Sequence, residues 1–310
     1  MTAFRFLHLD VFTGEPFEGN PLAVFPDGRG LSDRLMQRIA REMACPETTF
    51  VLPAAAAGTD ARVRIFTPRA ELPMAGHPTI GTAFALAHDG VIARGQAGVV
   101  FGEGVGPIEI DMEWRHGQLA FAWMKQPLPV FGPPIDGAVE IGRVAAAVGL
   151  EADDLRASGL PVQEGASGAP FLFVPVATRA TVDRAEPDLR AMRVLFETLG
   201  SAAQGVYLFS AEPGADGATT YSRMFAPDLG ISEDPATGSA SGPLGAYLVR
   251  HAVVSPERAG RILNLQGVRM QRPSWMHVRV ELAGSAVAGV RVGGAAVLVA
   301  EGTLHGRGTI

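Results

Sequence analysis

The chain opens with alternating apolar and polar residues, the pattern of a half-buried β-strand. This alternation covers Arg5–Phe12, and a short apolar run follows at Leu22–Phe25 after the turn-rich loop Thr13–Pro21. Further strand-like runs occupy Thr49–Pro53 and Ala61–Thr67. The hydrophobic pattern therefore predicts a first part of the chain in which strands dominate.

Two segments of this part have a helical pattern instead. Apolar residues recur every four positions, at Leu31, Leu35, Ile39 and Met43. This spacing places them on one face of an amphipathic helix, and Ser32 stands where a serine caps a first turn. The second segment begins with Gly76-His77-Pro78 and stays apolar to about His88, which predicts a helix buried on all sides.

The second half of the chain repeats these features in the same order. The matching segments are Gly19–Leu22 with Gly168–Phe171, Leu31–Ala44 with Pro187–Leu199, Phe50–Leu52 with Tyr207–Phe209, Phe66–Pro68 with Phe225–Pro227, and Gly76 with Gly238. Their separations run from 149 to 162 residues, about half of the 310-residue chain. Chance agreement among common glycines and prolines is the alternative, but ordered matches at a nearly constant separation favour an internal duplication.

Strand pairs, and not a regular βαβ series, follow the first helical part. Gly106–Trp114 and Gln118–Lys125 are predicted as antiparallel strands on either side of a turn. The proline-rich stretch Gln126–Pro134 is the best candidate for a linker. We therefore predict an α+β fold. Its expected parts are one domain of residues 1–128, a second of residues 129–295, and a last strand at about 296–310 that returns to the first domain.

Composition excludes several classes of function. Cys45 is the only cysteine, so one chain cannot hold a disulfide framework, a zinc ribbon or a two-cysteine catalytic pair. Lys125 is the only lysine, so a Schiff-base enzyme would have to use it. The formal net charge is -6 and the arginines are scattered, which argues against a nucleic-acid partner. No run reaches the ~18 apolar residues of a membrane helix. We therefore expect a cytoplasmic protein with neither nucleic acid nor membrane as partner.

One acidic residue stands in an unusual place. Glu47 lies between the end of the first predicted helix and an apolar strand. A carboxyl group that points inward there loses water, which favours the tuning that a general acid/base needs near neutral pH. The plainer interpretation is a solvated glutamate in a turn. The position matched to Glu47 in the second half is Gln204, which cannot titrate, so the duplication predicts a single site.

Two further segments open the buried helices with small residues. Gly76 and His77 open one helix, while Gly238 and Ser239 follow Asp234 at the other. The N–H groups of a first helical turn and the helix dipole suit a carboxylate or phosphate. His77 is suited to hold a substrate or pass a proton, and Asp234 to bind an ammonium or hydroxyl group. The plainer interpretations are a capping histidine and the start of an ordinary turn.

Other catalytic motifs have weak support. Ser239 and Ser241 stand in Thr-Gly-Ser-Ala-Ser-Gly, which is not the Gly-x-Ser-x-Gly elbow of serine hydrolases. The 7 histidines are dispersed and have no metal-binding spacing, so we expect no metal site. The glycine-rich segment Gly102–Gly106 leads into a strand and not a helix, unlike a dinucleotide-binding loop.

Several motifs stand in order along nearly the whole chain. They are Asp10–Thr13, Gly19–Val24, Glu47–Phe50, Phe66–Pro68, Leu72–Gly81, Glu233–Ala240, Gln266–Gly267, Arg272–Ser274, Val292–Gly294 and Glu301–Gly302. On these motifs the chain resembles the PhzF-like isomerase family of phenazine biosynthesis, within the diaminopimelate-epimerase-like fold. The resemblance implies two pseudo-symmetric domains, each a mixed barrel-like β-sheet around a central α-helix, with the site in the cleft between them. It also implies a homodimer that needs no cofactor.

The matching positions imply roles for individual residues. Glu47 would be the general acid/base, and the residues that bind substrate or relay protons would be Asn20, Gly76, His77, Asp234, Gly238 and Ser239. Related two-cysteine racemases place a thiol at each helix opening, where this chain has His77 and Ser239. The resemblance therefore implies an isomerase that moves a proton on a small amino- or hydroxy-carboxylate, with dihydro-hydroxyanthranilate as one option. A lyase or epimerase on the same scaffold, and a non-catalytic member that binds a small molecule or a protein, are the alternatives.

Overall fold

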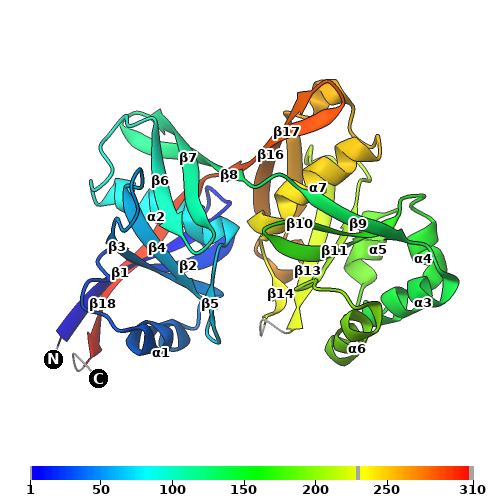
Figure 1. Cartoon of the computed structure of the whole chain (residues 1–310), viewed down its shortest axis with the longest axis horizontal. Coiled ribbons are helices and arrows are strands. Elements are labelled where there is room, and N and C mark those ends of the chain that lie inside the picture. Colours follow the sequence, from blue (N-terminus) through cyan, green and yellow to red (C-terminus); the bar gives the residue numbers. More distant parts are fainter. Residues whose placement is uncertain (1, 228–230, 307–310) are drawn as a thin grey trace. The chain divides into compact units, whose positions relative to one another are not determined.

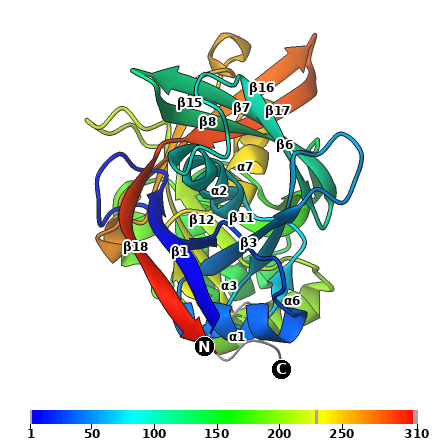
Figure 2. The same ribbon diagram turned by 90° about the vertical axis from the view of Figure 1, so that its left-hand side faces the viewer.

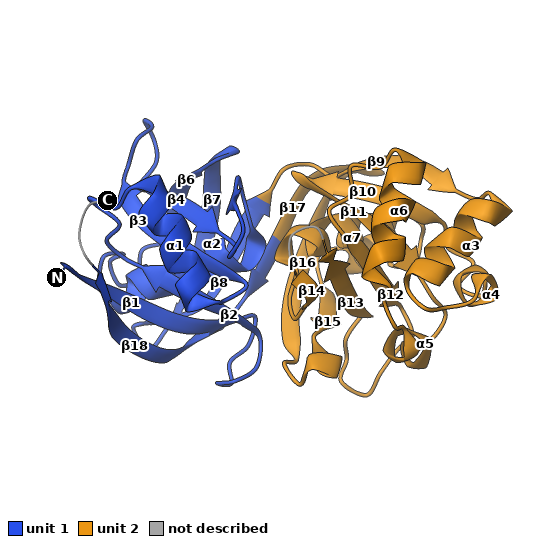
Figure 3. Cartoon of the chain, turned by 90° about the horizontal axis from the view of Figure 1, so that it is seen from below, with its two compact units in different colours: residues 1–125, 292–310 blue, residues 126–291 orange. Residues whose placement is uncertain are grey.

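A computed structural model describes residues 2–227 and 231–306 of the chain (Figure 1). The chain divides into two compact units, unit 1 with residues 1–125 and 292–310 and unit 2 with residues 126–291 (Figure 3). The boundaries predicted from the sequence, after residues 128 and 295, lie three and four residues further along. Residues 307–310 of the last predicted strand lie outside the described residues.

The described residues of unit 1 form two helices and nine strands of a mixed sheet. Its elements are β1 (Thr2–Val11), β2 (Asn20–Phe25), α1 (Asp33–Met43), β3 (Glu47–Pro53), β4 (Ala61–Phe66), β5 (Glu71–Leu72), α2 (Gly76–His88), β6 (Gly98–Glu103), β7 (Gly106–Arg115), β8 (Gln118–Gln126) and β18 (Ala296–Gly306). β1 is antiparallel to both β18 and β2, β2 is parallel to β3, and β3 is antiparallel to β4. β4 is parallel to β6, and β6, β7 and β8 form an antiparallel meander.

Helix α2 is the centre of unit 1, and Figure 2 shows it among the strands. Every residue from Gly76 to Leu86 is buried, which explains why the helix is apolar on all sides. A Cβ atom at Gly81 would come 2.5 Å from Leu22 Cδ2 and 2.7 Å from Val11 Cγ2, so β1 and β2 approach the helix closely because this residue is glycine. The predicted bounds of this helix are confirmed.

Helix α1 covers another part of the sheet with one face. Ser32 caps it as predicted, since its hydroxyl accepts a hydrogen bond from the Leu35 N–H. Its buried residues are Met36, Ile39 and Ala40, and they pack in one cluster with Phe25, Phe50 and Phe66. Leu31 belongs to this cluster, and Leu35 and Met43 pack against it, so the predicted apolar face is confirmed. Leu35 and Met43 are only half-buried, and Leu31 precedes the helix, because the helix begins at Asp33.

Unit 2 repeats this plan and adds helices. Its elements are β9 (Val130–Ile135), α3 (Ala138–Ala147), α4 (Ala152–Arg156), β10 (Val162–Ser167), β11 (Ala169–Pro175), α5 (Arg179–Arg184), α6 (Leu189–Leu199), β12 (Val206–Ser210), β13 (Thr220–Ala226), β14 (Ile231–Asp234), α7 (Gly238–Arg250), β15 (Ile262–Gln266), β16 (Ser274–Ala283) and β17 (Ala286–Gly294). β11 is parallel to β12 and β13 to β15, while β10–β11, β12–β13 and β15–β16 are antiparallel. This is the order of pairings from β1 to β7, so the predicted α+β fold with two pseudo-symmetric domains is confirmed.

Helix α7 corresponds to α2 and is likewise buried, from Gly238 to Leu248. These two helices have 13 residues each. Within the described ranges, no helix is both long enough and apolar enough to cross a membrane.

The proline-rich stretch predicted as a linker is mostly strand. β8 extends to Gln126, and β9 pairs antiparallel with β10, with Ile135 opposite Val162. Only residues 127–129 lie between the two strands. Proline favours extended backbone and can join a strand where its missing N–H is not needed, so the composition of this stretch was misleading.

Strand register gives the residue-by-residue correspondence between the units. β3 places Thr48 opposite Phe66 of β4, and β12 places Val206 opposite Phe225 of β13. Because Phe66 and Phe225 are matched residues, Thr48 corresponds to Val206.

The same register corrects the counterpart of Glu47. It is Gly205, and the Gln204 expected from the sequence is wrong by one residue. Unit 2 has a glycine at this position because a side chain does not fit: a Cβ atom at Gly205 would come 2.5 Å from the Phe225 carbonyl oxygen. Gly205 has no titratable side chain, so the acidic group is still present in one unit only.

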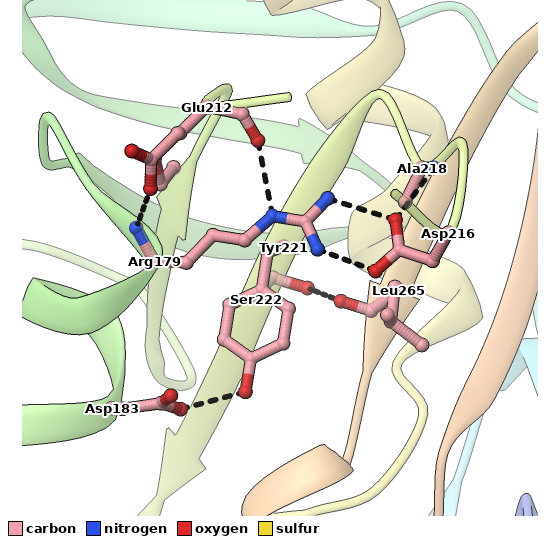
Figure 4. Close-up of polar contacts among 9 residues, drawn as sticks. Arg179, Asp183, Glu212, Asp216, Ala218, Tyr221, Ser222 and Leu265 are labelled. Atoms are coloured by element: carbon pink, nitrogen blue, oxygen red, sulfur yellow. Dashed lines mark hydrogen bonds and ion pairs between the residues drawn. The ribbon is translucent and has the colours of Figure 1, made fainter. Parts of the chain in front are cut away.

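A polar cluster fastens α5 to the loop between β12 and β13 (Figure 4). Arg179 donates to the Asp216 carboxylate from both terminal nitrogens and to the Glu212 carbonyl from Nε. Tyr221 donates to Asp183 at 2.6 Å, and burial together with this carboxylate raises the pKa of Tyr221, so the phenol stays a donor. The cluster stabilises unit 2 and contains none of the predicted site residues.

Candidate active site

Unit 1 brings Glu47 and His77 into contact. Glu47 is the first residue of β3 and His77 the second residue of α2. Glu47 Oε2 lies 3.2 Å from His77 Nε2, and only 9% and 4% of the two side chains are exposed. Glu47 therefore points inward from the start of a strand, and the interpretation as a solvated turn glutamate is wrong.

Burial keeps the His77 ring neutral. It lowers the pKa of His77 to about 3, although a hydrogen bond to the Pro21 carbonyl opposes the shift. The ring must donate to that carbonyl, because a carbonyl oxygen can only accept. A neutral imidazole has one donor and one acceptor nitrogen. With the donor nitrogen turned to the Pro21 carbonyl, the other nitrogen, Nε2, faces Glu47 Oε2 at 3.2 Å, although this contact does not have hydrogen-bond geometry.

Asn20 and Gly76 complete the predicted residues of unit 1. Asn20 begins β2 opposite Val11 and is fully buried, and the next residue is Pro21, whose carbonyl binds His77. Gly76 begins α2 directly after Ala75, which has no side chain able to cap the helix. A helix N-terminus without a side-chain cap suits an anionic group.

Unit 2 places Asp234, Gly238 and Ser239 at the corresponding helix opening. Asp234 ends β14, and Gly238 and Ser239 begin α7. All three are buried, and Asp234 Oδ2 accepts a hydrogen bond from Thr237 Oγ1 at 2.6 Å. Thr237 is the N-cap residue, but its hydroxyl serves the carboxylate and does not cap the helix.

Gln266 holds this loop in place, a role that sequence reasoning missed. Its Nε2 donates to the Asp234 carbonyl at 2.7 Å and to Thr237 Oγ1 at 3.0 Å. Its Oε1 accepts from the Thr237 N–H at 3.2 Å and from the Tyr207 hydroxyl at 2.7 Å. The amide therefore uses both ends to fix the segment that carries Asp234.

Tyr207 and Asn264 extend the network into the core of unit 2. Asn264 Nδ2 donates to the Tyr207 hydroxyl at 2.7 Å, and its Oδ1 accepts from Thr220 and Ser222 at 2.9 Å. Burial raises the pKa of Tyr207 to about 12, so the phenol remains a donor. The sequence contains a pattern that could have revealed this network: in Ile262–Gln266, polar Asn264 and Gln266 alternate with apolar residues of a strand. Gln266 also belongs to one of the family motifs.

Metal ligands do not gather at either helix opening. Within residues 2–227 and 231–306, no group of three or more His, Cys, Asp or Glu side chains is arranged to hold a metal ion. The chemistry that the described residues can support is proton transfer at Glu47 and His77, together with the binding of polar groups at the two helix openings.

Comparison with known proteins shows the family to which the chain belongs. Residues 9–302 match the family model described as phenazine biosynthesis-like protein. A trans-2,3-dihydro-3-hydroxyanthranilate isomerase from Pseudomonas aeruginosa is 38% identical over 304 residues, which cover 97% of this chain and 99% of the relative.

Solved structures agree as well. A phenazine biosynthesis protein of the PhzF family from Bacillus anthracis superimposes with a TM-score of 0.85 at 29% identity, covering 98% of this chain and all of the other. A hydroxyproline epimerase from Agrobacterium vitis, covering 97% of this chain and 92% of its own, has a TM-score of 0.65 at 15% identity and so shares the fold. The chain therefore belongs to the phenazine biosynthesis-like, or PhzF, family and is an isomerase.

Proposed function

We propose that this isomerase works without a cofactor and moves a proton on a small amino- or hydroxy-carboxylate, with Glu47 as the general acid/base. The observation that carries the proposal is the buried contact of 3.2 Å between Glu47 Oε2 and His77 Nε2. A carboxyl group without bulk water and beside a neutral imidazole can take up and return a proton with little solvent reorganisation.

The reaction begins when the Glu47 carboxylate removes a proton from a carbon that is acidified by conjugation or by a carboxylate. The C–H bond breaks, an O–H bond forms on Glu47, and the electron pair moves into the conjugated system of the substrate. Backbone N–H groups at the opening of α2 stabilise the enolate-like charge that develops. The proton on Glu47 exchanges with solvent, and Glu47 then gives a proton to a different carbon, which completes the isomerisation without net gain or loss of atoms.

His77, which lies next to Glu47, assists the proton transfer. Its neutral ring is fixed by the bond to the Pro21 carbonyl, so it approaches Glu47 without adding a positive charge. It holds the carboxyl group in one orientation and exchanges a proton with it. Asn20, which precedes the Pro21 that binds His77, and Gly76, which precedes His77 itself, contribute polar contacts to the substrate.

Asp234, Gly238 and Ser239 bind polar groups of the substrate. The Asp234 carboxylate suits an ammonium or hydroxyl group, and the α7 opening suits a carboxylate. The relative from Pseudomonas aeruginosa acts on trans-2,3-dihydro-3-hydroxyanthranilate, which carries an amino, a hydroxyl and a carboxylate group. That compound is therefore the first substrate to test.

The experiment compares the unchanged protein with Glu47→Gln in heavy water. We expect product from trans-2,3-dihydro-3-hydroxyanthranilate or a related small amino acid to contain deuterium, and the variant to lose turnover while it keeps its fold. The exposed Glu42→Gln on α1 is the matched control and keeps full activity. Full activity of Glu47→Gln would reject Glu47 as the base. Saturable binding without turnover in the unchanged protein would favour a binding protein.

Product analysis in the same experiment separates the alternatives. A shifted double bond identifies an isomerase of the proposed kind, an inverted carbon an epimerase, and a lost substituent a lyase. Cytoplasmic location and a homodimeric state remain predictions, which fractionation and sedimentation would check.

A further inference from the structure

Glu103 is a buried acid that the proposed mechanism does not use. It is the last residue of β6, and only 9% of it is exposed. Its Oε1 lies 2.5 Å from Thr79 Oγ1 in the first turn of α2, the turn that also carries His77. Its Oε2 has no hydrogen-bond partner among the described residues. An ionised carboxylate would be costly in this position.

The hydrogen bonds of Thr79 indicate which group carries the proton. Thr79 Oγ1 also lies 2.6 Å from the Ala75 carbonyl oxygen. A hydroxyl has one hydrogen, and a carbonyl can only accept, so donation from Thr79 to Ala75 leaves none for Glu103. Both contacts are hydrogen bonds at once only if Glu103 is protonated and donates to Thr79. The geometry therefore fits a neutral carboxylic acid.

The internal duplication gives an independent argument. β4 and β6 pair Arg62 with Gly102, and β13 and β15 pair Tyr221 with Leu265 in the same parallel arrangement. The matched phenylalanines Phe66 and Phe225 make Arg62 correspond to Tyr221, so the next residue along β6, Glu103, corresponds to Gln266.

The residues that follow confirm this correspondence by their packing. A Cβ atom at Gly104 would come 2.7 Å from Pro73 Cα, and one at Gly267 would come 2.6 Å from the Pro235 carbonyl oxygen. Each proline stands three residues before the glycine that begins the central helix. In both units, the turn after the matched residue therefore presses on the segment that leads into the helix.

We propose that Glu103 is a positioning residue that acts as a neutral carboxylic acid and holds the first turn of α2, as the Gln266 amide holds the opening of α7. The partners differ, because Gln266 binds Asp234 and Thr237 while Glu103 binds Thr79. The chemistry is shared, because a protonated carboxyl and a carboxamide have the same shape and each has one donor side and one acceptor side. The catalytic role of His77 rests on the proposed function, but the state of Glu103 does not.

Among the described residues, no cation forms an ion pair with Glu103. The charged and titratable side chains on the elements packed around it are His77 and His88 on α2, Arg62 and Arg64 on β4, Glu71 on β5, and Glu109, Asp111, Glu113 and Arg115 on β7. Arg64 is paired with Asp33 and Glu71, and Arg62 is exposed. Burial raises the pKa of Glu103 from 4.5 to about 8.

The sign of the resulting pH dependence follows from linkage. The folded chain keeps the Glu103 proton to a higher pH than the unfolded chain, so this stabilisation is complete below the ordinary value of 4.5 and is lost as the pH rises to about 8. Opening of the first turn of α2 therefore becomes easier as the pH rises through this window. The equilibrium constant for this opening rises by at most about tenfold for each pH unit.

The test uses the full chain and needs no substrate. Hydrogen exchange of peptides that cover residues 75–80, corrected for intrinsic exchange, is measured between pH 5 and 9 in the unchanged protein, Glu103→Gln and the exposed control Glu42→Gln. Infrared spectra over the same range follow the carbonyl band of a buried protonated acid. We expect the band and the pH-dependent opening in the unchanged protein and the control, and neither in Glu103→Gln.

A converse variant completes the test. Gln266→Glu places an acid at the matched position, and we expect pH-dependent opening to appear at the first turn of α7. The proposal is overturned if the unchanged protein lacks the infrared band, if Glu103→Gln opens with the same pH dependence, or if Glu103→Gln does not fold. Because no turnover is measured, these outcomes are distinct from a failure of the proposed function.

Discussion

A carboxyl group takes its chemistry from its neighbours, and unit 1 shows this at two glutamates. Glu47 faces a neutral histidine at 3.2 Å, whereas Glu103 faces a threonine hydroxyl at 2.5 Å. Both are buried, but we propose that one carries the proton of the reaction and that the other holds a helix turn. Burial alone therefore does not assign a role, and the hydrogen-bond partners decide it.

Neutral His77 makes the stability of the chain depend on pH. The folded state lowers the pKa of His77 to about 3 from 6.5, so the unfolded chain binds a proton first as the pH falls. The stabilisation is present above pH 6.5 and is lost progressively toward pH 3. At pH 5 the loss amounts to about 2 kcal/mol. We expect His77→Gln to flatten this acid-side decline in urea unfolding between pH 4 and 7.

The matched control is His305→Gln, because His305 is exposed near the C-terminal end of β18. It keeps the acid-side decline of the unchanged protein. A His77→Gln curve that runs parallel to the unchanged curve would show that His77 is not the group responsible.

At the scale of elements, α2 and α7 are the supports to which both sets of site residues are attached. Each is buried over its first eleven residues, so its first turn cannot move without disturbing the sheet around it. The positions of His77 and Ser239 therefore depend on close packing of strands against these helices.

Substitution of Gly81 tests how closely the strands pack against α2. An added methyl group would overlap Leu22 and Val11, so we expect Gly81→Ala to destabilise unit 1 by about 1–3 kcal/mol. Gly142 lies in α3 with open space around its Cβ position, and Gly142→Ala is expected to stabilise the chain by about 0.5–1 kcal/mol. Thermal melting of the two variants measures the difference, and equal shifts would contradict close packing at Gly81.

Substitution of Gln266 tests whether its hydrogen bonds fix the loop before α7. Gln266→Leu leaves Thr237 N–H and Tyr207 hydroxyl donors without their acceptor, and each unsatisfied buried group costs about 1–3 kcal/mol. We expect a clear fall in the urea midpoint. Gln118→Leu on the exposed part of β8 is the control and changes stability little. An unaltered midpoint in Gln266→Leu would argue against its role in fixing Asp234.

At the scale of the whole molecule, the chain contains two units of one plan, and only unit 2 is continuous in sequence. Unit 1 needs β18 from the end of the chain, because β18 pairs with β1 from Ala296 opposite Val11 to Gly306 opposite Thr2. This pairing provides hydrogen-bond partners along β1, with a register shift between His8 and Leu9.

Truncation should therefore affect the units differently. We expect residues 126–291 alone to fold and melt cooperatively, and residues 1–125 alone to remain unfolded. Joining residues 292–310 to residues 1–125 through a glycine-serine linker should restore folding, because it returns the partner of β1. Circular dichroism melting of the three fragments checks this, and a cooperative melt of residues 1–125 alone would disprove the need for β18.

Local pattern was sufficient to predict much of the fold. The bounds of the helix at Gly76, the Ser32 cap and the duplication follow from periodicity and from residues with strict backbone preferences. The predicted linker does lie where the two units meet, but most of it is strand, and the counterpart of Glu47 is Gly205 and not Gln204; both differences have the same reason. Strand pairing and register depend on distant partners, and local composition does not contain them.

The sequence by itself determined which chemistry was available: one cysteine, one lysine, an acid before an apolar strand, and two helices opened by small residues. Only the tertiary structure decided that Glu47 meets His77 across 30 positions, that Gln266 fixes Asp234, and that Glu103 takes the same place in unit 1. The physical reason is that desolvation and hydrogen-bond partners control the protonation of a buried group, and both come from residues that are far apart in the chain.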